Sequence, residues 1–198
     1  MSISEGTNDR STIKGAARSP DPRSPFSKSL QGKNLTGTAR HLRDLAADVH
    51  GIIQRWNNST LEGMDILKSI SEEKNNENFT VQLQDYCDRL EDICCTLGNL
   101  VKDLEQIAHK VNILITLNKT PAKLFTTWPI STFGRTVEMI HEAYSNEMHI
   151  KREVLENIAH CHKESQKMLH ISAWLYQPLL SENITMLLEA MLTETGHR

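Results

Sequence analysis

The sequence is poor in aromatic residues and has no long apolar run. Only 5% of its 198 residues are Phe, Trp or Tyr, whereas 24% are charged. No apolar run approaches the roughly 20 residues that a membrane-spanning helix needs, and the N-terminus lacks the apolar core of a signal peptide. We therefore expect an intracellular protein with no membrane partner.

Cysteine is also scarce, and no two cysteines form a C-x-x-C pair; the four are Cys87, Cys94, Cys95 and Cys161. In an intracellular chain this pattern predicts buried, reduced thiols. His160-Cys161-His162 is the one cluster of metal-ligand residue types, but residues two apart on a helix point to nearly opposite sides. We expect no metal site.

The motifs that announce catalysis are absent as well. The sequence has no Gly-rich phosphate loop, no nucleophile elbow and no convergent pair of carboxylates, so we predict no catalytic residue, no cofactor and no enzyme activity. The net charge of -3 and the pI of about 6.3 are not typical of a protein that binds nucleic acid directly.

What the sequence does contain is a heptad pattern between Phe79 and Leu114, and it predicts one long helix there. Position a of the heptad holds Leu83, Leu90, Leu97, Leu104 and Val111. Position e holds Cys87, Cys94, Val101, Ala108 and Ile115, which are all small or apolar. A two-helix seam would carry charge at that position. The wider stripe favours an all-α fold, an elongated antiparallel helical bundle of long heptad-patterned helices.

A homo-oligomeric coiled-coil spacer with no kinase link is the alternative to this interpretation. It would use the same heptad pattern to join copies of the chain instead of closing one chain on itself. The wide stripe speaks against it, and a monomeric mass in light scattering would exclude it.

The first 33 residues differ from the rest, because they are rich in Ser, Pro, Gly and basic residues. We expect a disordered tail at 1–33 and a helical bundle domain at 34–198. The Ser-Pro pairs at Ser19 and Ser24 are candidate phosphorylation sites. Thr120 begins a T-P-x-K sequence, which is the pattern that cyclin-dependent kinases prefer.

Four more segments of the bundle are predicted from spacing. A heptad helix runs from Leu35 past Trp56, and Leu61, Met64, Leu67 and Ile70 continue it after a phase shift, as one kinked helix or as two. Asn76 or Asn78 is the expected N-cap of the long helix. A further helix starts at Thr132, a shorter one stops before Pro178, and the last runs from Ser181 to Gly196.

Three segments are more specific than the periodicity: Thr127-Trp128-Pro129 followed by Phe133, then Trp174-Leu175-Tyr176-Gln177-Pro178, and finally Glu194-Thr195-Gly196-His197-Arg198. With Ala46-Ala47-Asp48, His50 and Trp56, they make the chain resemble the cyclin-dependent kinase 2-interacting protein family over about residues 39–198. Val49 departs from the pattern, because family members carry a tryptophan there.

The resemblance implies a nuclear, non-catalytic adaptor. Its implied partners are a cyclin-dependent kinase, a second kinase of replication-origin firing and a checkpoint-kinase partner protein of the DNA damage response. It also implies membership of a chromatin-associated AAA+ ATPase complex concerned with replisome protein turnover and large ribosomal subunit maturation. The candidate partner-binding residues are Trp128, Pro129, Phe133, Trp174, Gln177, Pro178, Glu194, Gly196 and His197.

The heptad stripe can be tested by placing a charge in it. Leu97→Asp or Leu104→Asp should unfold the protein, because a carboxylate without a partner would be buried at a packed position. The measurement is thermal unfolding followed by circular dichroism. A variant that melts within a degree or two of the parent would show that this stripe is not the core.

Overall fold

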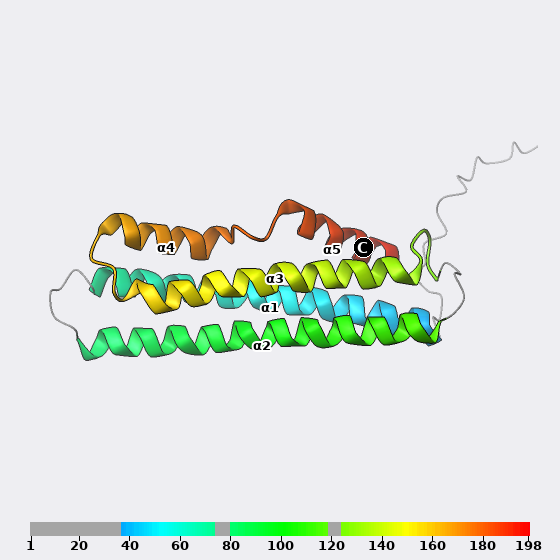
Figure 1. Ribbon diagram of the computed structural model, residues 1–198, viewed down its shortest axis with the longest axis horizontal. Helices are drawn as coiled ribbons and strands as arrows, with labels where there is room; N and C mark the ends of the chain where they lie inside the picture. The colour runs from blue at the N-terminus through cyan, green and yellow to red at the C-terminus, as the bar shows by residue number, and fades with distance from the viewer. Residues whose placement is uncertain (1–36, 74–79, 119–123) are drawn as a thin grey trace, which may run out of the picture.

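The structure, a computed structural model, describes residues 37–73, 80–118 and 124–198. In this part of the chain five helices and no strands are present (Figure 1). The helices are α1 (Gly37–Glu73), α2 (Val81–Leu117), α3 (Ile130–Ile158), α4 (Glu164–Tyr176) and α5 (Glu182–Thr195). The predicted all-α, elongated helical bundle is confirmed.

The helices run up, down, up and down, and the fourth position of the bundle is shared by two short helices (Figure 1). α1, α2 and α3 each span most of the long axis. α4 and α5 follow one another along α3, on the side away from α2. Both contact α1 and α3, whereas α2 contacts only α1 and α3. The interrupted fourth helix therefore lies in the groove between α1 and α3.

α2 carries the predicted stripe. The five residues at position a of the heptad are all buried: Leu83, Leu90, Leu97, Leu104 and Val111. The stripe is covered by α1 and α3 of the same chain. The helix begins later than predicted, because Thr80 is its N-cap and accepts a hydrogen bond from the Leu83 N–H at 3.1 Å. The assignment of the cap to Asn76 or Asn78 is therefore wrong.

α1 is one continuous helix and not two. Of the four residues predicted to continue the pattern, Leu67 and Ile70 are fully buried and Met64 packs against the core, but Leu61 is 59% exposed. Gly63 and Ile66, which keep the unshifted heptad spacing, are buried as well. Ser59, which is half-buried, also keeps this spacing, but neither it nor Gly63 has an apolar side chain. Gly63 is buried because another side chain, the Trp174 indole, fills the space that a side chain here would need.

α3 and α5 bury the faces expected of them. On α3 the row from Phe133 to Ile158 is buried, apart from the half-buried Leu155. α5 has Ser181 at its N-cap position, although its hydroxyl makes no capping hydrogen bond, and ends at Gly196 in the left-handed conformation (φ 75°). On α4, Ile171 and Trp174 are buried, while Met168 and Leu175 lie on the exposed side.

The cysteines are only partly as predicted. All four are free thiols; Cys94 and Cys161 are buried and Cys87 is half-buried, but Cys95 is exposed, which corrects the expectation that the thiols are buried. Cys95 follows Cys94 on α2, and adjacent helical residues point in different directions. Burial raises the pKa of Cys94 to about 12 and also raises the pKa of Cys87.

Several predictions fall on residues outside the described ranges. The tail at 1–33 and the candidate phosphorylation sites Ser19, Ser24 and Thr120 are among them. No helix in 37–73, 80–118 or 124–198 combines the length and the apolar character needed to cross a membrane.

Gly63 offers a test of how α4 sits on α1. A Cβ built at Gly63 lies 2.3 Å from Cζ2 of Trp174, whereas a Cβ at Gly51 of the same helix meets nothing within 4 Å. Gly63→Ala should lower the free energy of unfolding by about 1–3 kcal/mol, because the indole must move. Gly51→Ala is the matched control and should raise it by about 0.5–1 kcal/mol through helix propensity.

The measurement for both variants is urea unfolding followed by circular dichroism. If Gly63→Ala stabilises the protein as much as Gly51→Ala does, the indole does not occupy the notch at Gly63.

Candidate functional site

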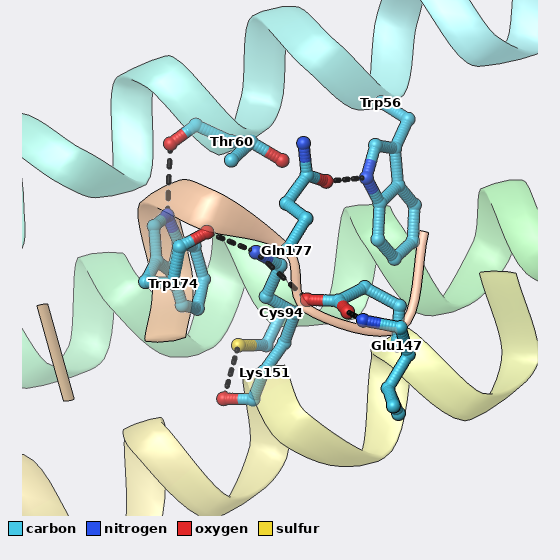
Figure 2. Close-up of polar contacts among 8 residues, drawn as sticks. Trp56, Thr60, Cys94, Glu147, Lys151, Trp174 and Gln177 are labelled. Carbon is cyan, nitrogen blue, oxygen red and sulfur yellow. Dashed lines mark hydrogen bonds and ion pairs between the residues drawn. The ribbon is translucent and has the colours of Figure 1, made fainter. Parts of the chain in front are cut away.

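The break between α4 and α5 is built on a buried ion pair. Lys151 and Glu147 lie one turn apart on α3, both fully buried, with Nζ and Oε1 separated by 3.4 Å (Figure 2). Lys151 Nζ also donates to the Trp174 carbonyl, at the end of α4. Glu147 Oε2 accepts from the Leu179 N–H at 3.1 Å. The pair thus satisfies backbone groups that the break would leave unpaired.

Two tryptophans complete this junction from the α1 side. The Trp174 indole N–H donates to the Thr60 carbonyl at 2.8 Å, and its ring lies 4.7 Å from Lys151 Nζ. The Trp56 indole N–H donates to Gln177 Oε1 at 2.6 Å (Figure 2). Gln177 has a left-handed backbone (φ 46°), which is uncommon outside glycine. Its side chain therefore stabilises a turn that its backbone disfavours.

Burial dominates the electrostatics of the pair. Desolvation lowers the pKa of Lys151 to about 8, although Glu147 opposes the shift. Desolvation likewise raises the pKa of Glu147, and the Leu179 N–H and Lys151 oppose that shift. Lys151 is held in place by Glu147 and by a backbone carbonyl, so its role here is structural.

A second group of hydrogen bonds, which we call a tie, joins the segment at Thr127 and Trp128 to Glu194. Glu194 of α5 is buried and accepts from the Thr127 hydroxyl at 2.9 Å and from the Trp128 N–H at 2.8 Å; it also accepts from the Thr127 N–H. Burial alone would raise the pKa of Glu194, but these hydrogen bonds lower it below its ordinary value. The T-W-P segment and the E-T-G-H-R segment are thus one structural unit.

Aromatic packing fixes the other side of this unit. The Trp128 and Phe133 rings lie 5.2 Å apart at an angle of 65°, and Phe125 lies 5.3 Å from Phe133. His197 hydrogen-bonds through Nε2 to the Arg43 carbonyl of α1 at 2.8 Å. Arg198 pairs with Glu189 of α5. The segment after Gly196 therefore lies against α1 and α5.

The nine candidate residues fall in two places. Trp128, Pro129, Phe133, Glu194, Gly196 and His197 gather near the start of α3, whereas Trp174, Gln177 and Pro178 lie at the α4–α5 junction (Figure 1). Phe133, Trp174 and Glu194 are buried, Trp128, Gln177 and Gly196 are half-buried, and Pro129, Pro178 and His197 are exposed. Their contact with partners stays a prediction.

The sequence analysis missed Glu147, Lys151 and Thr60, which are buried polar residues. Lys151 could have been noticed, because it lies three residues after Met148 and four before Leu155, in the gap of the predicted apolar row. No group of three potential metal ligands occurs among residues 37–73, 80–118 and 124–198.

The architecture defines an all-α antiparallel bundle with four helix positions, the fourth shared by α4 and α5, in which the sequence motifs join neighbouring helices. No protein-family model matches the chain. It is similar to "Cyclin-dependent kinase 2-interacting protein" of Xenopus laevis, 28% identical over 194 residues, and of Bos taurus, 29% identical over 195 residues. Both alignments cover 83% of this chain and 92% of the relative. The chain is therefore similar to cyclin-dependent kinase 2-interacting proteins over most of its own length and of theirs.

The pKa of Lys151 predicts how stability changes with pH. Between pH 8 and 10.5 the folded protein has lost a proton that the unfolded chain still binds at Lys151, so this residue makes stability rise with pH. From pH 7 to 9 the parent should gain about 1 kcal/mol relative to Lys151→Met, since the slope is at most about 1.4 kcal/mol per pH unit.

The measurement is urea unfolding at pH 7, 8 and 9. This range ends where Cys94 begins to act in the opposite direction, because its thiol ionises in the unfolded chain from about pH 9. Lys102→Met changes an exposed lysine of α2 and serves as the control, with a constant difference from the parent. A constant difference for Lys151→Met as well would contradict the buried pair.

Proposed function

We propose that this chain is a non-catalytic adaptor that links a cyclin-dependent kinase with a second kinase of replication-origin firing. The observation that carries the proposal is the similarity to relatives named as interacting proteins of cyclin-dependent kinase 2, among them one of Homo sapiens that is 27% identical over 195 residues. That name says what those proteins contact, and the proposal extends the contact to this chain.

The chemistry of the described residues supports an adaptor. Among residues 37–73, 80–118 and 124–198, Lys151 and Glu147 form the one ion pair with both side chains fully buried, and both bond backbone groups of the α4–α5 junction. The other motif residues form ties between helices, as the hydrogen bonds of Glu194 do. A rigid scaffold with side chains presented on its loops is a common arrangement for binding partners.

We extend the proposal to the finer roles that the family resemblance implies. The adaptor acts in the nucleus, supports checkpoint-kinase signalling in the DNA damage response, and is a subunit of a chromatin-associated AAA+ ATPase complex. That complex serves replisome protein turnover and maturation of the large ribosomal subunit. Each role predicts a different partner, so one purification experiment addresses them together.

Variants in the T-W-P segment or at the C-terminal segment that bonds it should lose binding partners. Trp128→Ala, or truncation after Glu194, should lower recovery of the kinases or of the AAA+ ATPase subunits by about tenfold, because a tryptophan often carries much of an interface's energy. Deletion of residues 1–33 should leave most partners attached. The measurement is affinity purification in mild salt with quantitative mass spectrometry.

Met139→Ala is the matched control, since it removes another large side chain from α3 that is 42% exposed. Because Trp128 packs on Phe133, circular dichroism must show that each variant keeps its helix content. A folded Trp128→Ala protein that recovers every partner would contradict the site. A parent that recovers no kinase, replication factor or ATPase would contradict the adaptor function.

A further inference from the structure

A pocket of about 310 Å³ opens beside the α4–α5 junction, on the side facing α1. Its walls come from four parts of the fold: Gln54 and Asn57 of α1, Tyr144 of α3, Tyr176 and Gln177 at the α4–α5 junction, and Leu188 and Glu189 of α5. Gln177 is one of the nine candidates and accepts the hydrogen bond from Trp56, whereas the other residues named here take no part in the hydrogen bonds of the junction. Most of the pocket lining therefore has no assigned role in the bundle.

Tyr144 of α3 lies in this pocket and is nine-tenths buried, with 6% of its surface exposed. Its ring is held edge-on against Trp56, with the centroids 5.1 Å apart and the planes at 88°. Within the described part of the chain, its hydroxyl has no hydrogen-bond partner. The buried side-chain atoms without a hydrogen bond among the described residues are Thr60 Oγ1 and Glu147 Oε1, so the Tyr144 hydroxyl is within reach of solvent, and a ligand in the pocket can pair with it in place of water.

The tyrosine is also chemically suited to that task. Burial raises the pKa of Tyr144 to about 12, and the charge of Glu147 adds to the shift. The phenol therefore stays neutral near pH 7, where it can both donate and accept a hydrogen bond. A ligand group that donates hydrogen bonds can therefore pair with the phenol oxygen of Tyr144, which carries no negative charge of its own.

The carboxylate at the rim of the pocket already pairs with a guanidinium group, which indicates the kind of cation that the pocket can bind. Glu189 lines the pocket and is paired with the guanidinium of Arg198. Both side chains are about half exposed, 40% for Glu189 and 53% for Arg198, so the ion pair is accessible to a competing guanidinium. An exposed ion pair of this kind contributes little stability, which makes exchange feasible.

The other residues that line the pocket suit a guanidinium group better than a compact cation. Tyr176 is 77% exposed and offers an aromatic face at the rim. Gln54 and Asn57 carry side-chain carbonyls that accept hydrogen bonds, and Leu188 provides apolar surface for an aliphatic stem. Arginine combines a planar fork of five donors, a tendency to stack on aromatic rings and an apolar stem, whereas lysine is a compact charge.

We propose that this pocket binds an arginine side chain within an extended segment of a partner protein, and that Arg198 occupies its carboxylate until the partner displaces it. The inference rests on the proposed adaptor function only for the existence of such a partner. Binding of a model peptide tests the pocket itself, so failure of either idea can be recognised separately.

The experiment uses the full chain and the peptide acetyl-Gly-Ala-Arg-Ala-Gly-amide, with binding followed by NMR chemical shifts at residues 144, 176 and 189. The same peptide with citrulline, lysine or leucine in place of arginine provides the comparisons. We expect the arginine peptide to bind about fivefold more tightly than the citrulline or leucine peptide, the difference that one exposed ion pair can supply. It should also bind more tightly than the lysine peptide, because an ammonium group lacks the planar fork of donors.

Variants of the two partners in the Glu189–Arg198 ion pair should change peptide binding in opposite directions. Glu189→Gln should weaken binding of the arginine peptide about fivefold, because the carboxylate is lost. Arg198→Ala should instead tighten it by two- to fivefold (about 0.4–1 kcal/mol), since the internal competitor is removed. Tyr144→Phe should weaken it by a similar factor, and Glu105→Gln, a change on the exposed side of α2, should have no effect.

A purely structural role for the pair would predict that Glu189→Gln and Arg198→Ala act in the same direction. That result would overturn the proposal, as would equal binding of the citrulline and arginine peptides or the absence of shifts with the arginine peptide. Tighter binding of the leucine peptide would show that the pocket takes an apolar side chain. Circular dichroism of each variant must match the parent.

Discussion

The bundle depends on the way Trp174 fits against α1. Its indole ring fills the space left by Gly63, its N–H bonds the Thr60 carbonyl, and its own carbonyl receives the buried Lys151 amine. One residue thus joins α1 and α3 at the end of α4. Because α4 is short, it could not stay helical on its own in water, so its position depends on this packing.

The break between α4 and α5 is unfavourable because it leaves backbone polar groups without helical partners, and side chains elsewhere in the bundle offset this. A break in a buried helix exposes backbone donors and acceptors, and here Glu147, Lys151 and Gln177 supply their partners. A buried pair of charges is seldom a net source of stability, but it disfavours other arrangements of the chain. The pair therefore fixes where the fourth helix is divided, and with it the pocket at Tyr144.

The hydrogen bonds of Glu194 and Gln177 give the three sequence motifs a structural role. Glu194 holds the segment at Thr127 and Trp128, while Gln177 holds Trp56. Residues that are distant in sequence therefore depend on each other. A change in one segment is therefore felt at the other, even where the residues are too buried to contact a partner directly. It also separates these residues from Tyr176 and Glu189, which are accessible.

The sequence alone determined the helical class, the stripe of α2 and the ends of α5, because heptad spacing and the Ser181 and Gly196 signals are local properties. Only the tertiary structure decided that Gly63 and Lys151 are core residues, that Leu61 is not, and that Glu194 meets Thr127. The physical reason is that burial of a glycine or a charged residue depends on what another helix brings to it. Tyr144 illustrates both: its place on the apolar face followed from spacing, and its open hydroxyl from packing.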